Sequence, residues 1–169
     1  MYIHRLYMIS IITIIDYIGY YGPVILFALT FYCLLNRTPY LIAFTFGSIL
    51  NTYANEVLKQ IFREPRPPNQ LVFIDSNHLK GAHHYGLPSG HAQTAAFALA
   101  FLALSQGPPA FLYFMTGIFA ITLYQRWKYN RHNIKQLAFG AMVGAFMAWL
   151  IHFMTQYVLH GYKYRVSFL

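Results

Sequence analysis

The chain has 169 residues, of which 57% are hydrophobic and only 9% are charged. Soluble domains carry about a quarter charged residues, so this composition excludes an ordinary soluble enzyme and indicates an integral membrane protein. The formal net charge of +8 is compatible with nucleic acid, anionic lipid or a phosphorylated substrate as a partner. The positions of the charges must decide among these.

The predicted elements begin with a helix at the membrane interface over residues 6–15, which is about half a span long. The polar residues Ser10, Thr13 and Asp16 recur every three positions there. Turn signals rich in Gly, Pro and Asn, together with the long polar segment 63–87, separate the apolar stretches that follow. Five crossings are expected, over residues 17–35, 40–62, 91–104, 110–124 and 136–159. The predicted fold is an all-α integral membrane protein with a single domain, residues 1–169. It is a bundle of about five transmembrane helices plus an N-terminal interfacial helix.

Two short motifs indicate how these helices pack. Gly22-Pro23 predicts a kink in the first span. Gly140 and Gly144 have the G-x-x-x-G spacing that lets two helices approach closely in lipid, and we expect this approach within the chain rather than in a dimer. The oligomeric state stays open. The single cysteine, Cys33, excludes a disulfide or a cysteine metal cluster within one chain.

Counting the crossings assigns the amino-terminal segment and the loops 63–87 and 125–135 to one face of the membrane. Nine of the 12 Lys and Arg residues lie on this face: Arg5, Lys59, Arg63, Arg66, Lys80, Arg126, Lys128, Arg131 and Lys135. The basic charge is gathered at one end of the bundle, as in an anion site. Nucleic acid is disfavoured as a partner because these residues flank spans and no soluble platform accompanies them.

Two short pieces of sequence on this face supply candidate phosphate ligands. Lys59 ends the second span, and Arg66 is expected in extended chain because it precedes a proline. An ammonium and a guanidinium hold phosphate oxygens in complementary ways, although snorkelling at the interface explains this piece equally well by itself. Ser89, Gly90 and His91 open a helix whose free N–H groups attract an anion, with a helix cap as the alternative. The spacing excludes the G-x-S-x-G elbow of a serine hydrolase.

A third piece runs from Arg126 through Arg131 and His132 into the last span. His132 and Gln136 are four residues apart, so on a helix they share one face and can form a hydrogen bond. A lone histidine is more often a structural residue. Three such pieces on one face favour a site.

The combinations K-x-x-x-x-x-x-R-P from Lys59, P-S-G-H over 88–91 and R-x-x-x-x-x-H from Arg126 resemble three signatures of a known family. That family is the type-two phosphatidic acid phosphatase and vanadium haloperoxidase superfamily, and the resemblance covers about residues 17–159. It implies a metal-independent phosphatase without a cofactor. In the family, the residue matching His132 is the nucleophile that forms a phosphohistidine, and the one matching His91 is the general acid. The resemblance assigns the phosphoryl oxygens to Lys59, Arg66, Ser89, Gly90 and Arg126.

The third signature departs from the family pattern at both ends, with Gln125 in place of Ser and Gln136 in place of Asp. Gln136 can accept the ring N–H of His132 but carries no charge. The dolichyl diphosphatase branch is similar at this point, and the stretches REPRP and YGLPSGHAQ also resemble it. We therefore expect a polyisoprenyl diphosphate as substrate. The alternatives are a phosphatidic acid or other glycerolipid phosphatase and a catalytically silent protein that binds lipid phosphate.

Other expectations concern the second phosphate, the lipid tail and the orientation. Arg63, one turn after Lys59 if the helix continues, and Arg131 are expected to contact a second phosphate. The small residues Ala92, Ala95, Ala96 and Ala100 are expected to leave room for the tail. The positive-inside rule favours a cytoplasmic site, whereas the resemblance implies the lumenal or extracytoplasmic face, which we adopt. A zinc site formed by His78, His83, His84 and His91 is a minor alternative.

Overall fold

The computed structural model describes residues 2–71, 73 and 84–166. Five helices make up this part of the chain: α1 Tyr2–Leu34, α2 Thr38–Phe62, α3 Gly90–Leu104, α4 Pro109–Lys128 and α5 Ile134–Val166. The described ranges form no strand, only an isolated antiparallel bridge between Pro65 and Tyr85. The prediction of an all-α protein is therefore confirmed.

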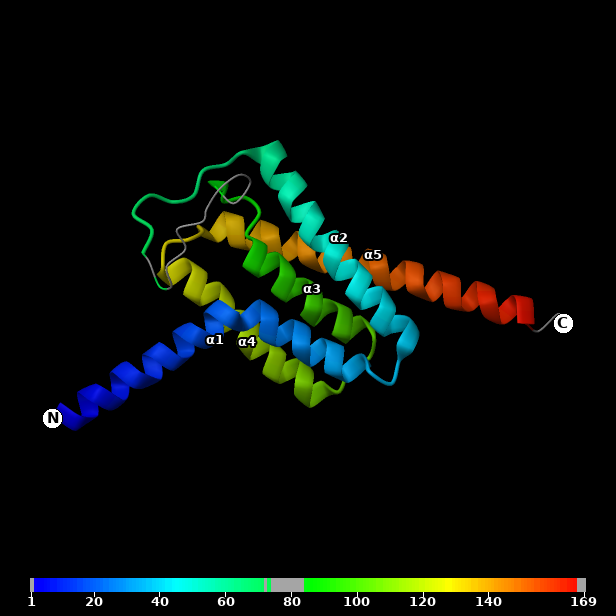
Figure 1. The fold of residues 1–169 in the computed structure, drawn as a ribbon, viewed down its shortest axis with the longest axis horizontal. Helices are drawn as coiled ribbons and strands as arrows, with labels where there is room; N and C mark the ends of the chain where they lie inside the picture. The colour runs from blue at the N-terminus through cyan, green and yellow to red at the C-terminus, as the bar shows by residue number, and fades with distance from the viewer. Residues whose placement is uncertain (1, 72, 74–83, 167–169) are drawn as a thin grey trace.

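α1 is one continuous helix, which corrects the predicted division into an interfacial helix and a separate span. The residues before Pro23 include no other proline, so the helical hydrogen bonds continue past position 16. Asp16, which suggested an interface, is buried, and its Oδ2 lies 2.6 Å from Nζ of Lys128. α1 changes direction partway along its length (Figure 1). Pro23 lies inside the helix, as the predicted kink requires.

α3 lies at the centre of the bundle and packs against the other four helices (Figure 1). Its alanines at 92, 95 and 96 are buried, so they fill the core and do not leave the room for a lipid tail that the sequence suggested. α5 crosses α3 at two glycines. A Cβ added at Gly144 would lie 2.0 Å from the carbonyl oxygen of Gln93, and one at Gly140 would lie 2.6 Å from that of Ser89. The G-x-x-x-G spacing thus serves packing within the chain.

The outer surface carries large apolar side chains that a soluble protein would bury. Examples on α2 and α5 are Ile42, Phe46, Ile49, Phe146, Trp149 and Phe153, all exposed. Among the described residues, two segments are long and apolar enough to cross a membrane, Ile11–Leu34 and Ile134–Gly161. α3 has 15 residues and at 1.5 Å per residue is shorter than the ~30 Å hydrocarbon layer. Five crossings stay a prediction.

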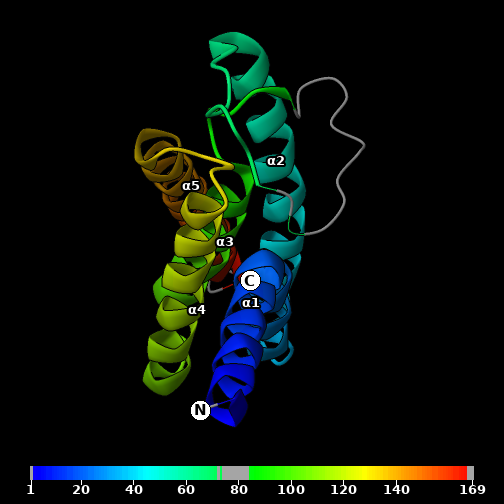
Figure 2. The same ribbon diagram turned by 90° about the vertical axis from the view of Figure 1, so that its left-hand side faces the viewer.

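The connections that carry the three motifs meet at one end of the bundle (Figures 1 and 2). Backbone hydrogen bonds tie them together: the N–H of Gly86 donates to the carbonyl of Glu64 at 2.8 Å, and that of Leu71 to the carbonyl of Tyr129 at 3.0 Å. The side-chain amide of Asn130 donates to the carbonyl of Pro68. Segments distant in sequence are held together where the candidate site residues lie.

Candidate active site

Lys59 occupies the last turn of α2 and is only 4% exposed. The helix ends at Phe62 because Arg63 adopts a left-handed conformation with φ 49°. Arg63 was expected beside Lys59 only if the helix continued through it. Because the helix ends one residue earlier, that expected placement does not apply. The exposed side chain of Arg63 donates through Nε to the carbonyl of Gln60 at 3.0 Å, and Arg63 does not line the cavity described below.

Arg66 lies in the extended connection after α2, beside the bridge between Pro65 and Tyr85. Its Nη1 is 3.3 Å from Nε2 of His132 and 3.4 Å from the carbonyl oxygen of Arg131. Burial, and next the charge of Arg131, lower the pKa of Arg66 to about 10. The guanidinium remains charged at neutral pH, and its partial burial strengthens its interaction with an anion.

Ser89 is the N-cap of α3, and its Oγ accepts a hydrogen bond from the N–H of Ala92 at 3.4 Å. The side chain is fully buried and does not line the cavity, so the structure shows the capping role that was the alternative interpretation. Gly90 and His91 do line the cavity. A Cβ at Gly90 would lie 3.3 Å from Oδ1 of Asn55. The first turn of α3 therefore presents backbone N–H groups and an imidazole to the cavity.

Arg126, near the end of α4, is 6% exposed, and its guanidinium lies 5.9 Å from the ring centroid of Tyr20. Its Nη1 donates to Oε1 of Gln125 at 3.4 Å. Its Nε is buried and has no hydrogen-bond partner among the described residues. A buried guanidinium with an unused donor is suited to an anionic ligand.

His132, two residues before α5, is 2% exposed. Its Nδ1 lies 2.9 Å from the carbonyl oxygen of Gly86 and 3.3 Å from Oε1 of Gln136. A backbone carbonyl only accepts hydrogen bonds, so the ring proton is assigned to Nδ1. Nε2 then carries the free electron pair, beside Arg66. Burial, and next the charges of Arg66 and Arg126, lower the pKa of His132 well below its ordinary value of 6.5, so the ring is neutral at pH 7.

A cavity of about 500 Å³ joins these groups. Of the residues predicted from sequence, it is lined by Lys59, Arg66, Gly90, His91, Arg126, Arg131 and His132. Arg63, Ser89 and Gln136 lie outside its lining. In the part of the chain that the structure describes, neither Lys59 nor Arg126 forms a salt bridge with a carboxylate. The cavity thus offers buried positive charge beside an unprotonated imidazole nitrogen.

The structure adds residues that the sequence did not single out. Tyr20 and Asn55 line the cavity. Asn55 donates to Oε1 of Gln93 at 2.7 Å and to the carbonyl of Pro88 at 3.4 Å, which connects α2 to the start of α3. Asn55 lies four positions, about one helical turn, before Lys59, and a polar residue there within an expected crossing was a usable signal. Nothing in the sequence near Tyr20 distinguished it from the other tyrosines.

No group of three or more potential metal ligands occurs within the described residues. Of the proposed zinc ligands, His78 and His83 lie outside those residues. His84 is exposed. His91 lines the cavity together with the cationic side chains, and their positive charge opposes the binding of a metal cation.

A helix bundle with a buried, cationic and histidine-containing cavity at one end has the charge and the chemical groups suited to binding an anion such as a phosphoryl group. Residues 40–159 match the PAP2 superfamily, more than half of the chain, and the chain belongs to that superfamily. The predicted superfamily is confirmed, whereas the dolichyl diphosphatase branch stays a prediction. No curated protein matches the chain.

A solved structure supports the same fold. The chain is similar to the first transmembrane PAP2-type phosphatidylglycerolphosphate phosphatase from Bacillus subtilis, with a TM-score of 0.58 and 20% sequence identity. The match covers 86% of this chain and 76% of that chain. At this identity the likeness shows a shared fold, and with the two apolar helices it supports a membrane protein.

Proposed function

We propose that this chain is a membrane lipid phosphatase that works through a phosphohistidine at His132. The observation that carries the proposal is the single cavity shared by Lys59, Arg66, Arg126 and the two histidines. Fixed cations around a phosphoryl group stabilise the charge that develops in its transfer. A neutral imidazole whose proton is held on Nδ1 has its other nitrogen unprotonated and therefore able to act as a nucleophile.

The proposed reaction has two steps. The Nε2 electron pair of His132 forms a bond to phosphorus, and the bond from phosphorus to the leaving oxygen breaks. That oxygen takes a proton from His91, which becomes protonated once the phosphoryl anion has entered and offset the neighbouring cations. The oxygen of a water molecule then bonds to phosphorus while His91 takes a proton from that water. The bond from phosphorus to Nε2 breaks, its electron pair returns to His132, and inorganic phosphate leaves. Lys59, Arg66 and Arg126 bind the phosphoryl oxygens throughout, together with the backbone at Gly90. Ser89 contributes indirectly by capping α3.

The test is phosphate release by the purified protein from a panel of lipid phosphates, combined with trapping of a labelled phosphoenzyme. His132→Ala should abolish both signals. His91→Ala should slow formation of the phosphoenzyme by about 10²–10⁴-fold, the usual contribution of a general acid. His160→Ala, on the exposed end of α5, is the matched control and should retain full activity. Full activity in His132→Ala would end this mechanism, and a wild-type protein that binds lipid phosphate without releasing phosphate would establish the silent alternative.

For the substrate we propose a polyisoprenyl diphosphate. Arg131 lines the cavity beside the three ligand cations and supplies a partner for a second phosphate, and a charge-assisted contact contributes about 1.5–3 kcal/mol. Arg63 no longer belongs in this role, because it is exposed and outside the cavity. It becomes the control. Arg131→Ala should reduce the preference for a diphosphate over its monophosphate at least tenfold, and Arg63→Ala should leave that preference unchanged.

A glycerolipid phosphate is the alternative substrate. The solved structure similar to this chain is named as a phosphatidylglycerolphosphate phosphatase, and the described cavity contains no feature that excludes a glycerol backbone. Competition between a polyprenyl diphosphate, its monophosphate and phosphatidic acid decides between the two classes. If phosphatidic acid is the best substrate, the glycerolipid assignment replaces the polyisoprenyl one.

Exposed residues in the lining of the cavity indicate that it opens to the side of the bundle, between α1 and α2. Tyr21 and Val24 on α1 and Thr52 on α2 all line it, and all three are exposed, Val24 by 65%. This opening, rather than the alanines of α3, is the proposed entry for the lipid tail. Val24→Trp should therefore raise KM for long-chain substrates more than for a soluble phosphate ester.

We propose that the site faces the lumenal or extracytoplasmic side. The side can be tested with single cysteines in a Cys33→Ala background. One replaces Asn69, beside the site, and the other replaces Asn36, in the turn between α1 and α2. Both positions are exposed. The cysteine at 69 should react with an impermeant reagent from outside and the one at 36 only after permeabilisation. The reverse pattern would place the site in the cytoplasm.

A further inference from the structure

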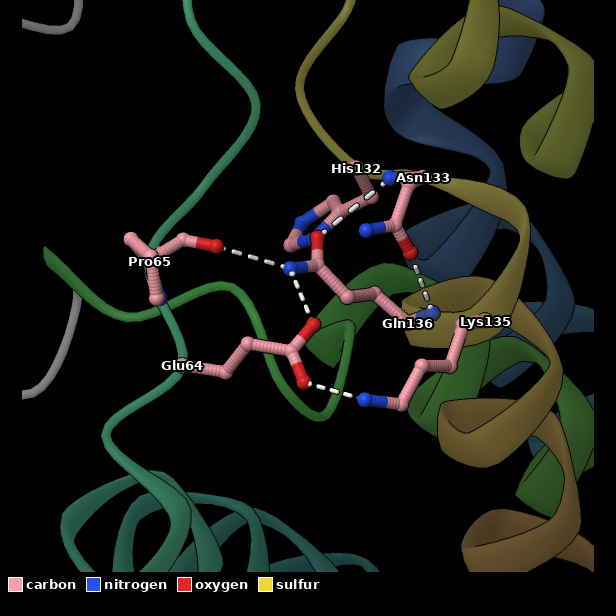
Figure 3. Close-up of polar contacts among 6 residues, drawn as sticks. All are labelled: Glu64, Pro65, His132, Asn133, Lys135 and Gln136. Carbon is pink, nitrogen blue, oxygen red and sulfur yellow. Dashed lines mark hydrogen bonds and ion pairs between the residues drawn. The ribbon is translucent and has the colours of Figure 1, made fainter.

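Gln136, which stands where the family has Asp, is held by partners on both sides of its amide (Figure 3). Its Nε2 donates to Oε1 of Glu64 at 3.0 Å and to the carbonyl oxygen of Pro65 at 2.9 Å. Both partners only accept hydrogen bonds, so the amide nitrogen must face them. The amide oxygen is consequently directed to the opposite side, where it lies 3.3 Å from Nδ1 of His132.

The same oxygen takes part in a capping box at the start of α5. The backbone N–H of Asn133 lies 3.3 Å from Oε1 of Gln136, and the N–H of Gln136 donates to Oδ1 of Asn133 at 2.8 Å. This reciprocal pair fixes the side chain of Gln136 on the first turn. The capping pair explains why a glutamine is structurally suitable at position 136. It does not explain why a carboxylate, that of Glu64, lies on the other side of the amide.

Glu64 supplies that carboxylate from a connection 72 positions away in the sequence. Its Oε2 lies 2.7 Å from Nζ of Lys135, a pair at the surface (Figure 3). The hydrogen bond from Lys135 lowers the pKa of Glu64; burial opposes this shift, and the hydrogen bond from Gln136 adds to it. Glu64 is therefore ionised at neutral pH, and a negative charge faces the nitrogen end of the amide.

We propose that Glu64 is a positioning residue that acts on His132 through Gln136. Its carboxylate replaces, from behind the amide of Gln136, the negative charge that an aspartate would place directly beside the ring. The proposal rests on the function proposed above. When Nε2 of His132 bonds to phosphorus, the ring gains positive charge while its proton stays on Nδ1. The carboxylate of Glu64 orients the amide and polarises it, so that Oε1 accepts more strongly from Nδ1–H as that charge develops. Gly86, whose carbonyl is the other acceptor, leaves room for this arrangement, because a Cβ there would lie 2.5 Å from Nε2 of Gln136.

The test separates charge from hydrogen bonding. Glu64→Gln retains side-chain length and an acceptor for Gln136 but removes the charge. Lys135→Gln removes the ion pair to the same carboxylate and leaves Glu64 beside Gln136. We expect Glu64→Gln to lower kcat about 10–100-fold, by analogy with the loss of a hydrogen-bond partner behind a metal-bound histidine, with KM changed little. Lys135→Gln should lower kcat less than about threefold, because exposed ion pairs contribute little.

In a Gln136→Glu background, the effect of Glu64→Gln on kcat should change sign. In Gln136→Glu a carboxylate faces Nδ1 directly, and Glu64 becomes a like charge beside it. Adding Glu64→Gln to that variant should raise kcat, whereas a merely structural role predicts a further decrease. This comparison also decides the matter if Glu64→Gln by itself does not fold.

Two results would overturn the proposal. One is a Glu64→Gln variant with the kcat of wild type while His132→Ala is inactive, in which case the proposed function stands without Glu64. The other applies if the wild-type protein releases no phosphate and the proposed function fails. The NMR resonance of the Nδ1 proton of His132 then decides, because it should move upfield in Glu64→Gln and stay in place in Lys135→Gln. An unchanged resonance in both removes the link between Glu64 and the ring.

Discussion

Substitution of Gly144 by alanine tests the crossing of α5 over α3 on which the site depends. The added Cβ would lie 2.0 Å from the carbonyl oxygen of Gln93, 2.9 Å from its carbonyl carbon and 3.0 Å from the amide nitrogen of Phe97. All three are backbone atoms, which cannot turn away as a side chain can. Bringing the shortest contact to the 3.0 Å below which Cβ atoms essentially never occur requires the helices to separate by about 1 Å.

The expected cost lies toward the upper end of the roughly 1–3 kcal/mol typical of overpacked cores. The higher helix propensity of alanine offsets about 1 kcal/mol of it, so Gly144→Ala should lose about 2 kcal/mol. At about 2–4 °C per kcal/mol, the midpoint of thermal unfolding in detergent should fall by about 4–8 °C. Gly117→Ala on α4 is the matched control, because nothing lies within 4 Å of its added Cβ. It should gain up to about 1 kcal/mol. Equal stability of the two variants would refute the close crossing.

The remaining predictions concern charge and metal. Burial lowers the pKa of His132 in the folded protein. As the pH falls, the unfolded chain therefore binds a proton at this residue before the folded protein does. The contribution of His132 to the free energy of unfolding is thus complete above pH 6.5 and declines as the pH falls below that value. An NMR titration of the ring in the ligand-free protein should have its midpoint below 6.5, and a midpoint above that value would contradict the burial argument. Asp16→Asn should lower stability by about 2–3 kcal/mol in thermal unfolding, less than for a fully buried pair because the Lys128 side chain is 31% exposed. Phosphate release should survive EDTA, and a loss restored by zinc would point to the histidines near residue 80 instead.

Much of the helical architecture could be predicted because it follows from apolar segments punctuated by Gly, Pro and Asn. The expected ends of the second and fourth crossings lie within four residues of the observed ends of α2 and α4. The start of α1 was not predicted, because a buried Asp16 has the same local pattern as an interfacial one. Its partner Lys128 is 112 positions away, and only the folded chain brings the two together.

The candidate site was predictable to the extent that its residues sit in contiguous motifs. Lys59, Arg66, His91, Arg126 and His132 converge on one cavity. The position of Arg63 was not predictable, because it depends on the residue at which α2 ends. The hydrogen bond between Glu64 and Gln136 could not be predicted, because it joins two segments that are distant in the sequence. No local spacing of residues indicates that these segments lie side by side.

The sideways opening of the cavity bears on how this protein would choose among lipids. Removing an acyl or isoprenoid chain from a bilayer costs about 0.8 kcal/mol per methylene, so full extraction of a long lipid is prohibitive. With exposed Val24 and Thr52 at the edge of the cavity, only the headgroup has to leave the interface. Chain length would then have little influence on turnover, and lipids that share a headgroup would be processed in proportion to their abundance in the surrounding leaflet.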